Sequence, residues 1–119
     1  MTANTGTLEK ILITLDSEID TCIKQKLDES CAGKIWKYYI TAYSKSRDFV
    51  EHVSEEKISE KLAKIAEETI TAGMPKACKE AIHWLKQIYN ETGNKKCREN
   101  YNSLLKQYEA KFNEKYNGG

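Results

Sequence analysis

The scarcity of helix-breaking residues limits how this chain can fold more than any other feature. Its 119 residues include one proline, Pro75, and six glycines, three of which stand at positions 6, 118 and 119. Between the breaks, apolar residues recur every three or four positions, which is the period of a helix with one buried stripe. No segment keeps a strict two-residue alternation. The pattern predicts an all-α fold, a compact bundle of four to five helices.

The length fits a single domain, which we expect to cover residues 8–117 after a polar N-terminal segment, residues 1–7. The first helix should cover residues 8–26 and the second residues 31–53. Because the second helix carries two apolar stripes, we expect it to contact several neighbours and to be the central helix. One stripe contains Ile35, Tyr39, Ala42, Phe49 and Val53, and the other contains Trp36, Ile40, Tyr43 and Val50.

Local signals also predict where the remaining three helices begin and end. Ser54 should cap the third helix, and Gly73 should end it in a left-handed conformation. Pro75 suits the first turn of the fourth helix, because an amide hydrogen there has no partner within the helix. Gly93 should end this helix, and Asn94 should cap the fifth.

Four cysteines in a short chain indicate an oxidising compartment and a disulfide-linked bundle; they are Cys22, Cys31, Cys78 and Cys97. The first residues are polar and do not resemble a signal peptide, so we expect a secreted, mature chain from which the signal has been removed. Asn90 begins the pattern Asn-Glu-Thr, an acceptor for N-glycosylation in a secreted protein. The alternative is a cytosolic protein with four reduced thiols.

Four cysteines allow three sets of two disulfides. If the last two helices form an antiparallel hairpin, Cys78 and Cys97 are roughly 15 to 20 Å apart at about 1.5 Å per residue. A disulfide needs α-carbons within about 7 Å, so Cys22–Cys31 with Cys78–Cys97 is disfavoured. The other two sets remain open. A strict up-and-down arrangement leaves Cys97 at the opposite end from the other three, so we expect one connection, near Ser54, not to reverse the chain fully.

Charge and motifs argue against catalysis and against several classes of partner. The 19 basic and 18 acidic residues are interspersed and give a net charge of +1, which does not fit a nucleic-acid-binding protein. No apolar run is long enough to span a membrane. The two histidines, His52 and His83, stand in no catalytic or zinc-binding motif, and the cysteine spacing is unlike that of a zinc site. We therefore expect a protein that is not an enzyme and uses no cofactor or metal.

Binding is the remaining class of function. Interfaces favour aromatic anchors, and the chain has seven tyrosines and two tryptophans. Trp84, Tyr38 and Ile13 lie off the main stripes of their helices, which makes them candidates for contact with a protein partner. The alternative is that they pack against a neighbouring helix. A different hypothesis is a carrier with an internal cavity for a small apolar ligand.

Four segments of the chain carry a resemblance to known proteins: Gly6–Leu12 (GTLEKIL), Lys34–Tyr39 (KIWKYY), Met74–Cys78 (MPKAC) and Trp84–Cys97 (WLKQIYNETGNKKC). Together with the spacing of the cysteines, they resemble the anopheline mosquito salivary family that includes albicin and anophensin. The resemblance runs along most of the chain, from Gly6 to Gly119. This family has no short motif that would transfer individual binding residues to this sequence.

The resemblance implies a protein secreted into saliva that assists blood feeding, with a disulfide-linked four-helix bundle as its fold. It implies binding to a host plasma protein complex, the convertase of the alternative pathway of complement, which is held in an inactive form. Other family members are linked to the plasma contact system, so inhibition of kallikrein–kinin activation is the alternative function.

Overall fold

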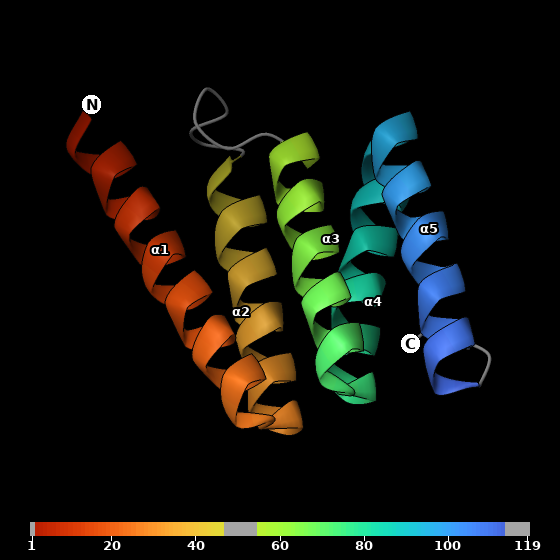
Figure 1. Cartoon of the computed structure of the whole chain (residues 1–119). Coiled ribbons are helices and arrows are strands. Elements are labelled where there is room, and N and C mark those ends of the chain that lie inside the picture. The colour runs from red at the N-terminus through yellow and green to blue at the C-terminus, as the bar shows by residue number, and fades with distance from the viewer. Residues whose placement is uncertain (1, 47–54, 114–119) are drawn as a thin grey trace.

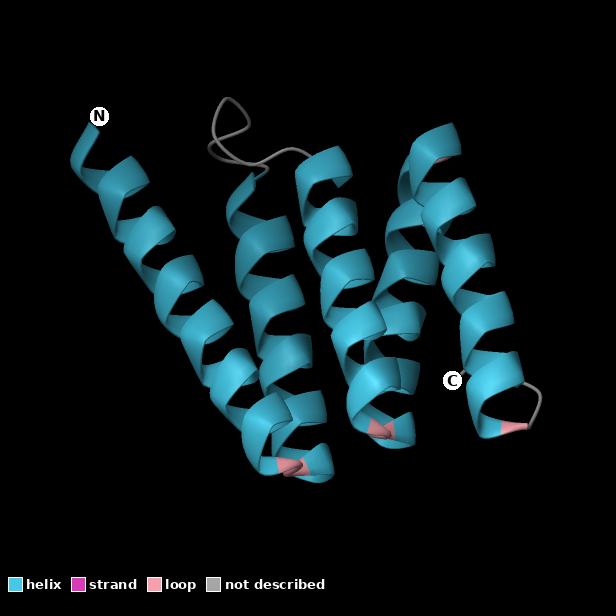
Figure 2. Ribbon diagram, in the orientation of Figure 1, coloured by secondary structure: helices cyan, strands magenta, loops and turns pink. Residues whose placement is uncertain are grey.

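The computed structural model describes residues 2–46 and 55–113, and it describes side chains for residues 9–44 and 56–113. The described chain is all-α. Its five helices are α1 (Thr2–Gln25), α2 (Asp28–Ser46), α3 (Glu55–Ala72), α4 (Pro75–Thr92) and α5 (Lys95–Phe112), and no strand occurs in these residues (Figures 1 and 2). The all-α prediction is confirmed.

The five helices form two layers. The layer facing the reader in Figure 1 contains α1, α3 and α5, and α2 and α4 lie behind it. Successive helices run in opposite directions, so helices within one layer are parallel. The reversal between α2 and α3 shows that the expectation of an incomplete turn near Ser54 was wrong, although Ser54 itself lies outside the described residues.

For the last three helices, most of the predicted starts and ends are confirmed. Gly73 and Gly93 both have positive φ, 74° and 65°, and the Gly93 amide donates to the Tyr89 carbonyl. Pro75 stands in the first turn of α4. The Asn94 side chain accepts hydrogen bonds from the amides of residues 96 and 97 at 2.9 and 3.1 Å, which caps α5.

The first two helices differ from the prediction at their ends. Helix α1 begins at Thr2, so residues 2–7, expected to precede the first helix, belong to it. It ends at Gln25, within one residue of the predicted end, and Lys26 takes the left-handed conformation (φ 57°). Helix α2 then begins at Asp28, three residues earlier than expected, because the turn needs only Lys26 and Leu27.

Helix α3, not α2, is the central helix, because it contacts each of the other four. Helix α2 contacts α1, α3 and α4, so the expectation that it has several neighbours is confirmed. On α2, Ile35, Tyr39 and Ala42 are buried, whereas Trp36 is 47 % exposed and Ile40 is 38 % exposed. Trp36 and Ile40 of the second stripe therefore face solvent, Tyr43 is half-buried, and Val50 lies outside the described residues. The expectation that α2 is the central helix was wrong.

An aspartate from α2 caps the start of α4. The Asp28 carboxylate accepts hydrogen bonds from the amides of Lys76 (3.2 Å) and Ala77 (2.7 Å). Met74, at the N-cap position of α4, supplies no side-chain hydrogen bond. Because the first amides of a helix have no partner within it, Asp28 satisfies two of them and places a negative charge at the positive end of the helix dipole. This contact joins the starts of two parallel helices.

Candidate partner-binding surfaces

The structure separates the three predicted anchor residues. Tyr38 is 8 % exposed, and burial raises the pKa of its hydroxyl to about 12, with a smaller contribution from the charge of Asp16. Tyr38 is therefore a core residue and not a surface anchor. Ile13 is 68 % exposed, and Trp84 is half-buried. These two line different grooves, so the three residues do not form one surface.

Trp84 lies between α4 and α2, at the end of an aromatic stack. Its ring stacks on Tyr39 at 4.5 Å between centroids, and Tyr39 stacks on Tyr43 at 5.3 Å. The indole Nε1 is buried and interacts with the Glu80 carboxylate, but it makes no hydrogen bond of good geometry within the described residues. Burial raises the pKa of Glu80, while the charge of His83 and the indole N–H lower it.

This stack borders an apolar surface that we call the α2–α4 aromatic surface, formed by Trp36, Ile40, Tyr43 and Trp84. A groove of about 420 Å³ lies along it, lined by Tyr39, Ile40, Tyr43, Ser44, Trp84, Gln87 and Glu91. Trp36 and Ile40 are among the exposed large apolar residues of the described chain. The sequence pattern assigned them to a stripe covered by a neighbour, because periodicity identifies an apolar face without showing what packs on it.

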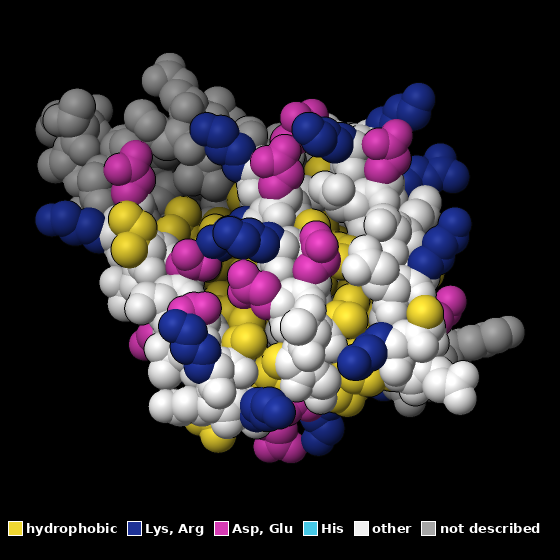
Figure 3. All heavy atoms as spheres, viewed as in Figure 1, with side chains coloured by type: hydrophobic (Ala, Val, Ile, Leu, Met, Phe, Trp, Pro, Cys, Tyr) yellow, Lys and Arg dark blue, Asp and Glu magenta, His cyan; other side chains and the backbone are white. Residues whose placement is uncertain are grey.

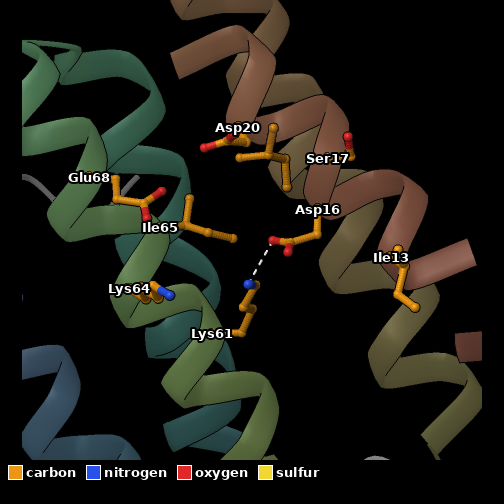
Figure 4. A pocket seen from close by; sticks show the side chains of 9 residues that line it. Ile13, Asp16, Ser17, Asp20, Lys61, Lys64, Ile65 and Glu68 are labelled. Atoms are coloured by element: carbon orange, nitrogen blue, oxygen red, sulfur yellow. Dashed lines mark ion pairs between the residues drawn. The ribbon is translucent and has the colours of Figure 1, made fainter. Parts of the chain in front are cut away.

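The second groove lies between α1 and α3, in the other layer, and we call it the α1–α3 groove (Figure 4). Its volume is about 290 Å³, and the Lys61 ammonium crosses it to reach the Asp16 carboxylate at 2.8 Å. It is lined by Ile13, Asp16, Ser17, Ile19, Asp20, Lys61, Lys64, Ile65 and Glu68. Ile19 and Ile65 are buried, so the floor is apolar and the sides are charged.

A second hollow of about 490 Å³ extends the α1–α3 groove toward the end of α3. It shares Asp20, Lys64 and Glu68 with the first and adds Ile23, Glu67, Thr71 and Ala72. The lining of both hollows together contains four carboxylates and two lysines. Neither hollow is a closed apolar cavity, which the hypothesis of a small-ligand carrier would require.

The four cysteines are buried, and no disulfide joins any two of them in the structure. Cys22, Cys31 and Cys78 lie where α1 ends and where α2 and α4 begin, and Cys97 lies in the first turn of α5, at the other end of the bundle. Burial is the main reason that the pKa of both Cys31 and Cys78 rises to about 12. Both thiols are therefore protonated, and slow to react, at neutral pH.

The other predicted features are located as follows. Asn90 is exposed in the last turn of α4, where a glycan can be accommodated. The hydroxyl of Thr92, in the same acceptor pattern, donates to the Ile88 carbonyl at 2.7 Å and accepts from the Asn94 amide at 3.1 Å. His52 lies outside the described residues, and the His83 ring packs edge-on against Trp84.

Over the described residues, no helix is both long and apolar enough to cross a membrane. Within the same residues, no group of three or more His, Cys, Asp or Glu side chains is arranged to hold a metal ion. Comparisons with protein-family models, with curated proteins and with solved structures find no match to this chain.

Proposed function

We propose that this protein acts by binding another protein through its outer surface. The observation that carries the proposal is the exposure of Trp36 and Ile40 on α2, next to the half-buried Tyr43 and Trp84. Large apolar side chains that a fold leaves in water are typical of interaction sites, and tryptophan and tyrosine are enriched among the residues that dominate binding energy.

We further propose that the protein is a secreted salivary inhibitor of the alternative-pathway complement convertase. The support for this target is the resemblance of the sequence to the anopheline albicin and anophensin family. An inhibitor that binds only the assembled convertase stabilises the inactive assembly by mass action. The groove along the α2–α4 aromatic surface and the α1–α3 groove lie on different layers of the bundle, so one molecule offers two separate faces to an assembled complex.

Paired assays test this proposal. The purified protein is added to human serum under alternative-pathway conditions with rabbit erythrocytes, and separately to plasma whose clotting is triggered by surface contact. Inhibition of lysis with unchanged clotting supports the complement target. Unchanged lysis with prolonged clotting identifies the alternative, a contact-system inhibitor. Activity in neither assay refutes both functions.

A pair of variants tests the surface. Trp36→Ala should reduce inhibition of lysis at least about tenfold, because removal of a central aromatic anchor commonly costs 2 kcal/mol or more, about 2 kcal/mol being some thirtyfold in affinity. Lys37→Ala, at the next position and also exposed, is the matched control and should keep full activity. Equal activity of the two variants would remove the α2–α4 aromatic surface from the proposal.

The oxidation state of the cysteines belongs to the same proposal. We propose that the secreted protein carries disulfides, as its cysteine content indicates. Cys22, Cys31 and Cys78 share one end of the bundle, whereas every set of two disulfides also uses Cys97. Cys97 lies roughly 15 to 20 Å from Cys78 along the α4–α5 hairpin, at about 1.5 Å per residue. A second bridge therefore requires the start of α5 to move, and mass mapping of the native protein would identify the pairs.

A further inference from the structure

The α1–α3 groove has the features of a docking site for a helix. It runs between two parallel helices, where the ridge of a third helix can pack. Its floor is apolar, since Ile19 and Ile65 are buried there, and Ile13 stands at its edge with 68 % of its surface in water. Amphipathic helices bind other proteins by placing an apolar stripe in a groove of this kind.

The charge around the groove is negative. Asp16 and Lys61 neutralise each other across it. Asp20 pairs with Lys24, which does not line the groove, at 3.1 Å. Of the other charged residues that line the two hollows, Glu67 and Glu68 are acidic and only Lys64 is basic, so carboxylates are in excess.

The whole helices show the same asymmetry. Helix α1 has four acidic residues and two lysines, and α3 has five acidic residues and three lysines. Helix α5 has five basic and two acidic residues. Figure 3 shows acidic and basic side chains interspersed over α1 and α3, and mostly basic side chains along the edge formed by α5. A positively charged ligand is thus steered toward the groove and away from α5.

We infer that the α1–α3 groove binds a basic amphipathic helix of the partner protein, one whose apolar stripe is flanked by lysine or arginine. The apolar stripe covers Ile13 and the floor of the groove, and the basic flanks lie beside Glu67 and Glu68. The inference rests on the proposed role as a protein-binding inhibitor and names the chemistry of the segment that this face recognises.

The probe is a fluorescent 18-residue peptide with leucines at helical spacing and lysines on either side, compared with the same peptide carrying glutamate in place of lysine. Binding is measured by anisotropy with the full-length protein. We expect the basic peptide to bind at least tenfold more tightly than the acidic one, and we expect this difference to shrink as salt is added. Equal binding of both peptides would overturn the inference.

Two matched pairs of variants locate the peptide. Glu68→Lys, in the groove, should weaken binding of the basic peptide about three- to tenfold, whereas Glu99→Lys, exposed on α5, makes the same charge change and should have little effect. Ile13→Ser should weaken binding, and Ile11→Ser, also exposed on α1 but outside the groove lining, should not. Circular dichroism verifies the fold of each variant. If the two variants of either pair weaken peptide binding equally, the peptide does not bind in the α1–α3 groove.

The outcome for the groove is separable from the outcome for the proposed target. If the wild-type protein inhibits lysis and Glu68→Lys inhibits equally well, the groove inference fails and the proposed function stands. If the peptide binds in the groove but the protein does not inhibit lysis, the target fails and the groove stands. A dimer of the protein alone that Glu68→Lys dissociates would show that the groove binds a second copy, which also overturns the inference.

Discussion

Replacement of Asp28 by alanine tests whether a residue of α2 holds the start of α4 in place. In the wild-type protein the Asp28 carboxylate accepts hydrogen bonds from the amides of Lys76 and Ala77, and Met74 offers no side-chain cap of its own. In Asp28→Ala both amides lose their protein acceptor. The change also removes two side-chain contacts that tie the start of α2 to the backbone of α4.

The size of the effect follows from these contacts. Loss of a helix cap costs about 0.5 to 2 kcal/mol. Loss of a charge at the positive end of the helix dipole adds about 0.3 to 1 kcal/mol. Asp28 is the first residue of α2, where helix propensities measured at interior positions do not apply. We therefore expect Asp28→Ala to lower the free energy of unfolding by about 1 to 3 kcal/mol, and Asp28→Asn, which keeps an acceptor oxygen, by about half of that.

The measurement is urea denaturation followed by far-ultraviolet circular dichroism at pH 7. Glu29→Ala is the matched control, because it makes the same change of charge at the next position of the same helix. Glu29 pairs with Lys76 at 3.0 Å, but both side chains are largely exposed, 84 % and 65 %, so its loss should cost less than about 0.5 kcal/mol. If Asp28→Ala and Glu29→Ala destabilise the protein equally, the cap between helices does not contribute as argued.

Three further predictions concern stability, each measured by denaturation of the purified protein. Leu85→Ala, at a fully buried position, should cost about 2 to 5 kcal/mol, whereas Trp36→Ala should cost less than about 1 kcal/mol; a larger loss for Trp36 would mean that its face is packed. Asn94→Ala should cost about 1 kcal/mol, because it removes the cap of α5, and an unchanged midpoint would contradict this. Burial raises the pKa of Cys31 and Cys78 from 9.0 to about 12, so the stability of the reduced protein should be complete below pH 9 and should fall as pH rises from 9 toward 12. A melting temperature that stays constant between pH 8 and pH 11 would refute that pH dependence.

The helix ends that the sequence predicted correctly are those set by local backbone chemistry. Gly73 and Gly93 adopt the positive φ that favours glycine, and Asn94 accepts from the amides two and three positions ahead. The start of α2 was predicted three residues too late, because Lys26, in the turn before it, takes the same left-handed conformation with a side chain that gives no such signal. Sequence therefore predicts a turn only where its backbone conformation or its cap requires a particular residue type, such as glycine or asparagine.

Burial was harder to predict than helicity, because it depends on how whole helices are placed. Tyr38 lies off the main stripe of α2 and is nevertheless buried, and Trp36 lies on an apolar stripe and is nevertheless exposed. Ile13, for which exposure and packing against a neighbour both remained open, is exposed. The α1–α3 groove had no signal in the sequence, since its lining comes from residues 13–23 and 61–72, which only the packing of the layers brings together.

The alternation of direction along the chain has a kinetic consequence. Each pair of consecutive helices, from α1 and α2 to α4 and α5, is in contact, so much of the packing joins segments that are close in sequence. In chains dominated by such local packing, the loops that must close before stabilising contacts form are short, so their closure costs little entropy. Such chains fold within microseconds to milliseconds. Dilution from denaturant under reducing conditions should therefore restore the native helix signal within the dead time, or the first few milliseconds, of a stopped-flow experiment.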